Sequence, residues 1–291
     1  MDRFVTLFAS GLLVGSVMAL TTVGFLILYK ATAIVNFAHG DIMTLGAYVA
    51  FWATSQHGLP LLGGYFLAIA LMSIVGIVMQ RVVFVPLRGK SPNVVLIATL
   101  AIALIVEAVL AIWQGPDIKS LGSPVGSGVV RIAGAPISDQ TLLIIAVAVV
   151  TVGVAIWVFQ YTQFGREVRA LAADEQMAML CGVRVRRLST IAFTTSAAFA
   201  GLAGILLGSA FGLNLTFGFN AMILAFGAAI VGGFGSIRGA VIAAVALGLV
   251  QQLVGGYVFT NFSSAMPYVV ILAVIIIRPK GLFAPVRQAR V

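Results

Sequence analysis

Charged residues are scarce in this chain of 291 residues, and their scarcity excludes most soluble folds. Lys, Arg, Asp and Glu make up 9% of the sequence, whereas hydrophobic residues make up 61% and the mean hydropathy is +1.14. An ordinary soluble domain is about 25% charged. Because so few ionisable groups cannot cover a soluble protein of this length, most of the outer surface is expected to face lipid.

Cysteine and histidine are nearly absent. The single cysteine, Cys181, excludes an intrachain disulfide and a thiolate metal cluster. The two histidines, His39 and His57, are too few for a histidine metal site. Gly89-Lys90-Ser91 looks like the end of a P-loop, but Phe84 stands where that motif needs its first glycine. We therefore predict no metal site and no nucleotide site in this chain. An intramembrane enzyme is a further alternative, but the sequence has no Ser–His pair, paired intramembrane Asp or HExxH motif that would support it, so we predict no catalytic residues and no enzymatic activity.

Basic residues outnumber acidic residues by 17 to 8. They lie in short loops and the tail rather than on one amphipathic face, so we expect no nucleic-acid partner. Cytoplasmic loops of membrane proteins are enriched in Lys and Arg. The basic segments at 81–90, 166–187 and 278–290 are therefore expected inside, and the Gly-, Pro- and Ser-rich segment 114–140 outside. Nine crossings would place the N-terminus outside and the C-terminus inside, whereas one re-entrant segment would change the side of the N-terminus.

Continuous apolar runs predict transmembrane helices. A transmembrane β-strand would alternate over about ten residues, and the runs here are about twice as long. The 32 glycines fit helices that pack closely in a bilayer. Six windows are long enough to span, and three shorter windows indicate short spans, half-helices or re-entrant segments. The long windows are 8–28, 60–80, 94–113, 141–160, 190–211 and 239–258, and the short windows are 41–54, 220–235 and 266–277. The prediction is an all-α, polytopic transmembrane bundle of eight or nine segments, forming one domain over residues 1–291.

Residues 161–188 form the one substantial hydrophilic stretch between two spans. Good helix formers run through it, and Gly182 is a plausible C-terminal stop, so we predict one short cytoplasmic helix. Its exposed apolar residues could insert into a groove on a soluble partner. An ordinary connecting loop with a surface helix is the alternative. The apolar residues expected on the exposed face are Val168, Leu171, Met177 and Leu180.

A polar break at residues 36–41 separates two apolar runs. Asn36 or Asp41 could cap a helix start, and Gly40 permits an unusual backbone, so the break fits an interrupted helix beside a pathway or gate. His39 could titrate or bind substrate, although capping and packing are favoured. Glu107 lies in an apolar window, where an ionisable group is costly, but it could also approach the outer interface. The candidates for a pathway or gate are Asn36, His39, Gly40, Asp41, Glu107, Gly232, Gly233 and Gly235.

Glycines are clustered in the second half of the chain. Gly204, Gly208 and Gly212 recur every fourth residue, so we expect another helix to pack closely against that face. The cluster within 232–239 could permit a bend or a moving contact, with static packing as the alternative. Each half of the chain also has a long helix followed by an interrupted stretch, at 36–46 and 218–239, and this pattern suggests an internal duplication.

Four segments, in order along the chain, resemble one family. GREVRALAADEQMAMLCGV at 165–183 is similar to the cytoplasmic coupling segment of permeases in the branched-chain amino-acid ABC importer family. NFAHGD at 36–41, GGFGSIRGA at 232–240 and RPKGLF at 278–283 resemble three further signatures of that family. The resemblance covers nearly the whole chain. The one departure, Ala-Pro at 284–285 where the family often continues with glycine, has no mechanistic consequence.

The resemblance implies a multi-pass subunit in a bacterial cytoplasmic membrane. Its expected partners are a second permease, usually a different chain, two cytoplasmic ATPases that bind ATP and Mg²⁺, and a periplasmic or extracellular solute-binding protein; this chain itself would hold no cofactor. Related permeases carry urea, short amides, other amino acids, ribose or nucleosides, and an ion-coupled carrier or channel is the rival from another class. The implied ATPase-coupling residues are Gly165, Arg166, Glu167, Arg169, Ala170, Asp174, Glu175 and Gly182.

Overall fold

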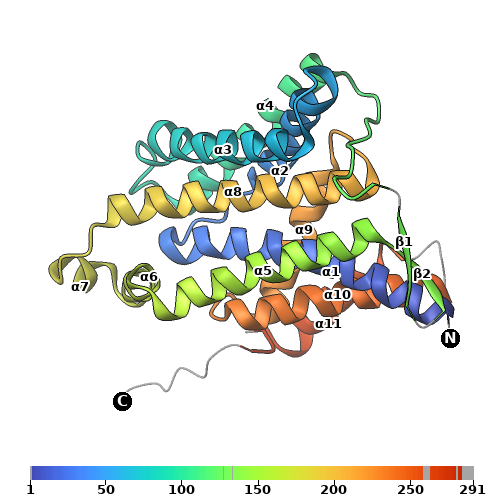
Figure 1. The fold of residues 1–291 in the computed structure, drawn as a ribbon. Coiled ribbons are helices and arrows are strands. Elements are labelled where there is room, and N and C mark those ends of the chain that lie inside the picture. The colour runs from blue at the N-terminus through green and yellow to red at the C-terminus, as the bar shows by residue number, and fades with distance from the viewer. Residues whose placement is uncertain (1, 127, 133, 258–262, 280, 284–291) are drawn as a thin grey trace.

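The structure is a computed structural model that describes residues 2–126, 128–132, 134–257, 263–279 and 281–283. It is an elongated helical bundle, with α6 and α7 at one end and the two strands with the N-terminus at the other (Figure 1). The long helices are α1 (Asp2–Thr32), α3 (Leu61–Met79), α4 (Pro92–Gln114), α5 (Asp139–Tyr161), α8 (Val185–Phe211) and α10 (Ile237–Tyr257). The shorter helices are α2 (His39–Phe51), α6 (Gln163–Ala173), α7 (Glu175–Leu180), α9 (Phe217–Gly232) and α11 (Met266–Ile277).

The predicted membrane helices are confirmed. Each of the six long windows corresponds to one helix that is long and apolar enough to cross a membrane, and α3 gains its last turn from the π-helix η2 (Gln80–Phe84). The three short windows correspond to α2, α9 and α11, and α2 continues into a second π-helix, η1 (Trp52–Gln56). An antiparallel hairpin of β1 (Val129–Ile132) and β2 (Ala135–Ser138), which the sequence did not predict, lies in the segment before α5.

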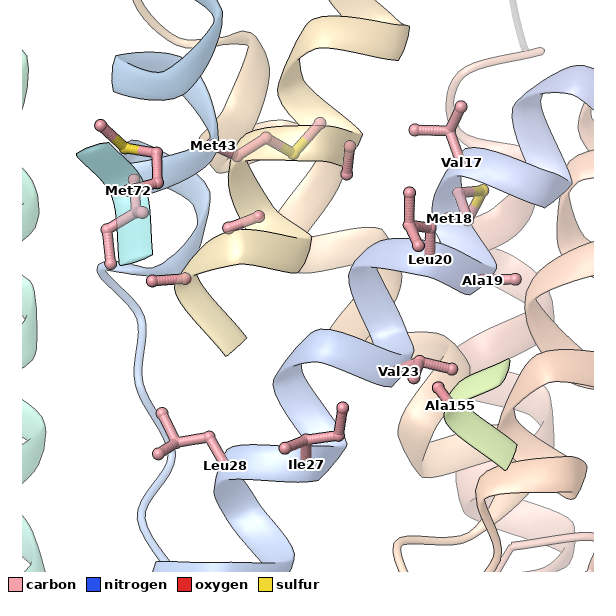
Figure 2. Close-up of a cluster of buried hydrophobic side chains, with 14 of the residues drawn as sticks. Val17, Met18, Ala19, Leu20, Val23, Ile27, Leu28, Met43, Met72 and Ala155 are labelled. Atoms are coloured by element: carbon pink, nitrogen blue, oxygen red, sulfur yellow. The ribbon is translucent and has the colours of Figure 1, made fainter. Parts of the chain in front are cut away.

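Helix α1 forms the centre of the bundle. In its most apolar window 94% of the residues are buried, against 22% in α3 and α4, because α5, α8, α9 and α10 all pack around it. Figure 2 shows its side chains pointing in several directions, with Val23 beside Ala155 of α5. A helix that is hydrophobic on all sides has no polar face that must contact water, which agrees with its central position.

The described parts of the three basic segments, residues 81–90, 166–187, 278–279 and 281–283, gather at one end of the bundle, which we call the basic end. Arg88 of the α3–α4 connection pairs there with Glu175 of α7, and Leu282 beyond α11 donates its backbone N–H to Val231 O of α9. At the opposite end, Lys119 exchanges backbone hydrogen bonds with Leu213. The first residues of α1 lie at that opposite end and residues 281–283 lie at the basic end, which agrees with an odd number of passes along the bundle. The side of the membrane that each end faces stays a prediction.

Candidate functional site

Helix α6 folds back against the end of α5. Gly165 makes this close approach possible, since a side chain there would collide with the carbonyl of Phe159. Thr162 caps the helix through its hydroxyl, which accepts from Gly165 N at 3.5 Å. The guanidinium of Arg169 then donates to Phe159 O and, at 3.4 Å, to Gln160 O. Gly165 and Arg169, predicted to couple to an ATPase, therefore fix the angle between α5 and α6.

The apolar residues of this segment divide between an inner and an outer face. Val168 and Leu171 are buried with Gly165 along one side of α6, so the prediction that they are exposed is wrong. They lie three residues apart, as expected for residues that share a helix face. Met177 and Leu180 on α7 are 62% and 81% exposed, in agreement with the prediction. The exposed apolar surface of the segment therefore lies on α7.

The predicted single helix is in fact two helices. Asp174 has an extended backbone, and its Oδ1 accepts from Met177 N at 3.0 Å, so it ends α6 and caps α7. A carboxylate at an N-cap also interacts favourably with the helix dipole. Gly182 ends α7 as predicted, in the left-handed region at φ +85°. Of the other expected coupling residues, Arg166 and Ala170 are exposed, and Glu167 accepts from Gln163 at 2.9 Å.

Two polar contacts attach this segment to the rest of the basic end. Arg88 Nη2 lies 2.8 Å from Glu175 Oε1, joining the α3–α4 connection to α7. Arg238 Nη2 at the start of α10 donates to Gln160 Oε1 at 2.5 Å. Arg169 of α6 donates to the backbone carbonyl of Gln160, so Gln160 connects α6 to α10. Neither Gln160 nor Arg238 was predicted as a site residue. Arg238 lies in the GGFGSIRGA signature at 232–240, whereas the only signal for Gln160 is a polar side chain in the last turn of an apolar helix.

The glycine-rich turn between α9 and α10 is held by neighbouring segments. Gly233 ends α9 with φ +86°, and its backbone is close to Gly281. Lys30 Nζ at the end of α1 donates to Gly235 O at 2.7 Å. Gly232 packs against the backbone of Ala240, so a side chain there would collide with α10. The turn is thus built by close backbone contact and one lysine.

The polar break at residues 36–41 is an extended entry into α2. Asn36 Oδ1 accepts from Ala38 N at 3.2 Å, which supports the turn before the helix. Gly40 lies against Gly218 at the start of α9, and neither position has space for a side chain. His39 is buried, with Nδ1 3.2 Å from Ser196 Oγ of α8. His39 therefore joins α2 to α8 within the core.

Asp41 is the polar residue of this region that lacks a visible structural role. It is 3% exposed, and its Oδ2 has no hydrogen-bond partner among the described residues. Tyr48 lies two turns further along α2, and its buried hydroxyl also has no hydrogen-bond partner among the described residues. Glu107 is half-buried on α4, which packs against α2.

The glycine face of α8 packs mainly against α2. A side chain at Gly204 would collide with the carbonyl of Met43 of α2, whereas one at Gly208 would first meet Leu213, which follows α8, and then Ala47 of α2. Gly212 does not extend this face: it follows the last residue of α8 and caps the helix at φ +82°. The expectation that all three glycines form one packing stripe is therefore corrected for Gly212.

Comparisons with known proteins agree on one family. The family described as branched-chain amino acid transport system / permease component matches residues 7–277. The permease protein LivH of the high-affinity branched-chain amino acid transport system of Escherichia coli is 29% identical over 287 residues, covering 94% of this chain and 93% of the relative. BraD of Pseudomonas aeruginosa has the same identity and coverage. LivM of Escherichia coli is 32% identical over 157 residues, which are 52% of this chain and 36% of LivM.

Proposed function

Because the chain belongs to the family of permease components of branched-chain amino acid transport systems, we propose that it is the membrane-spanning subunit of an ATP-driven importer for branched-chain or related amino acids. The observation that carries the proposal is the match over residues 7–277, which includes nearly all of the six helices that could cross a membrane, the short apolar helices and the α6–α7 segment. Similarity over 93% of LivH supports a whole permease subunit rather than a shared fragment.

The proposed partners follow from the same family. Similarity to both LivH and LivM supports a pathway formed by this chain with a related second permease. Two ATPases would bind ATP and Mg²⁺ and dock on α6 and α7 at the basic end, which would face the cytoplasm of a bacterial inner membrane. A solute-binding protein would deliver the amino acid to the opposite end. The chain itself would carry out no covalent chemistry and bind no cofactor.

The proposed mechanism is mechanical coupling. Met177 and Leu180 would insert into a groove on an ATPase, so that closure of the ATPase pair moves α7 and α6. Arg169 would carry that displacement to the end of α5, and Gln160 would carry it to α10 through Arg238. Movement of α10 against the central helix α1 would then switch the pathway from outward to inward.

The transport activity is tested in the assembled complex. The chain is coexpressed with its second permease, ATPases and binding protein and reconstituted into proteoliposomes, where ATP hydrolysis and uptake of leucine, isoleucine and valine are measured. We expect both to be stimulated by a branched-chain amino acid. Stimulation by urea, an amide or another solute alone would change the cargo. Uptake by this chain without ATP would replace the proposal with a carrier or channel.

The docking role of α7 is tested by retention of the ATPases during purification. Met177→Gln with Leu180→Gln is expected to lose them, because a polar side chain cannot replace apolar contact in a groove. Ile118→Gln is a matched control, since Ile118 is 77% exposed at the opposite end of the bundle. Full retention by the α7 variant would place the docking surface elsewhere.

A further inference from the structure

A cavity of about 710 Å³ opens at the basic end of the bundle. Its walls come from the end of α1 and the extended chain after it, η2, the start of α4, and the α6–α8 region. A second hollow, of about 550 Å³, adjoins it and shares Arg88, Val185 and Arg186. Neither hollow is used by the coupling mechanism.

The lining of the large cavity has an excess of positive charge. Its basic residues are Lys30, Arg88, Lys90 and Arg186, and its single acidic residue is Glu175. Glu175 is already engaged by Arg88, while Lys30 donates to a backbone carbonyl. Among the described residues, Lys90 and Arg186 form no ion pair, and the second hollow adds Arg184 and Arg187. Basic groups concentrated in a partly enclosed space favour an anion, above all one with several oxygens such as phosphate.

The cavity also contains an unsatisfied hydrogen-bond acceptor. Gln80 lines the cavity and is 3% exposed, and its Oε1 has no partner among the described residues. A buried amide oxygen without a donor is costly. A ligand that carries a hydroxyl beside its phosphate would supply that donor.

One wall of the cavity is apolar and continues along the membrane helix α4. Val95 and Leu96 line the cavity, and Leu100 and Leu104, which follow Leu96 on the same helix face, are 36% and 67% exposed. A soluble phosphate gains nothing from contact with an apolar wall, whereas an acyl chain attached to the phosphate would pack along it. The wall therefore favours a lipid as the source of the anion.

The geometry points to a binding site for the headgroup of an anionic phospholipid, with the phosphate between Lys90 and Arg186 and the acyl chains along α4. Basic pockets between membrane helices are suited to such headgroups, and each basic residue near an anionic membrane surface strengthens binding about fivefold. The inference goes beyond the proposed function, since it requires neither an ATPase nor an amino acid. It also places the lipid beside α7, where its phosphate would compete with Glu175 for Arg88.

Lysine footprinting of the unmodified sequence tests the site. The chain has four lysines, and Lys30 and Lys90 line the cavity, whereas Lys119 lies at the opposite end. The purified chain is placed in nanodiscs of pure phosphatidylcholine or of phosphatidylcholine with phosphatidylglycerol, and acylation by an amine reagent is followed by peptide mass spectrometry. Phosphatidylglycerol is expected to slow acylation of Lys30 and Lys90 about fivefold or more, with Lys119 unchanged. Equal acylation in both lipids would overturn the site.

Native mass spectrometry with charge variants tests the named residues. Lys90→Gln with Arg186→Gln is expected to weaken phosphatidylglycerol binding about 10- to 30-fold. Arg81→Gln with Arg278→Gln removes two exposed charges from the same end outside the cavity and is the matched control. Equal losses in the two variants would mean a diffuse electrostatic effect and would overturn the site. Displacement of the lipid by millimolar inorganic phosphate would assign the site to soluble phosphate and overturn the lipid.

Discussion

Arg238 at the start of α10 donates to the side chain of Gln160 at the end of α5, over 2.5 Å and a sequence separation of 78 residues. Gln160 is held at the same time by Arg169 of α6, which donates to its backbone carbonyl. A hydrogen bond from a charged donor contributes about 1.5–3 kcal/mol. The ends of α5, α6 and α10 are therefore joined through one glutamine.

Breaking this contact should uncouple ATP hydrolysis from uptake. Gln160→Leu removes the acceptor for Arg238 and keeps a side chain of similar size, so we expect the complex to hydrolyse ATP but to transport several-fold less amino acid per ATP. Gln160→Glu keeps an acceptor and adds an ion pair, so the amount of amino acid that it transports per ATP should stay near that of the wild type. Both rates are measured in the same proteoliposomes.

A nearby glutamine provides the control for that experiment. Gln163→Leu removes the bond from Gln163 to Glu167, which lies on the surface of α6 and does not reach α10. It should leave the ratio of uptake to hydrolysis unchanged. If Gln160→Leu transports as much per ATP as the wild type, Gln160 does not transmit the movement.

A methyl group at Gly204 should destabilise the bundle. Gly204→Ala places a Cβ against the carbonyl of Met43, so α2 and α8 must separate, at a cost of about 1–3 kcal/mol. Gly153→Ala is the matched control, because a side chain at that helical position meets no atom within 4 Å. Thermal unfolding in detergent should show a lower midpoint for Gly204→Ala only. A wild-type midpoint for Gly204→Ala would mean that the two helices can adjust their separation.

The membrane helices were predictable because lipid imposes a direct requirement on sequence. A span needs about 20 apolar residues, and this criterion identified the six long helices, while α2, α9 and α11 followed from shorter windows. The central position of α1 did not follow from its sequence. Helices that face lipid and helices that face protein are equally apolar, so hydropathy does not distinguish α1 from α3.

The candidate site was predictable as a segment but not residue by residue. Good helix formers and Gly182 indicated a helix near 165–182, yet the pattern did not show that Asp174 would divide it. Val168 and Leu171 were expected outside because the segment was treated as an isolated surface helix, whereas α6 packs against α5, α1 and α8 in the bundle and both side chains are buried. Arg238 and Gln160 meet only in the folded bundle, so no local pattern could predict the contact between them.

Removing the partner of Arg88 should strengthen lipid binding with little effect on stability. The Arg88 and Glu175 side chains are 56% and 55% exposed, and exposed pairs contribute about 0–1 kcal/mol. Glu175→Gln frees Arg88 for the headgroup, so we expect phosphatidylglycerol affinity to rise several-fold in native mass spectrometry. Glu167→Gln removes a carboxylate from α6 outside the cavity and should have a smaller effect. An equal rise in both variants would mean that net charge, rather than Arg88, controls lipid binding.

The orientation of the bundle can be read from its single cysteine. Cys181 is exposed between α7 and α8 at the basic end. If that end faces the cytoplasm, a membrane-impermeant maleimide should label Cys181 in inverted membrane vesicles but not in intact cells with a permeable outer membrane. Ser120→Cys in a Cys181→Ser background moves the thiol to an exposed position at the opposite end, so it should be labelled in cells and protected in inverted vesicles. Labelling of Cys181 in intact cells would mean that the basic end faces outside. Helix α7 would then be out of reach of any cytoplasmic ATPase. The proposed coupling mechanism would be wrong, although the fold would be unaffected.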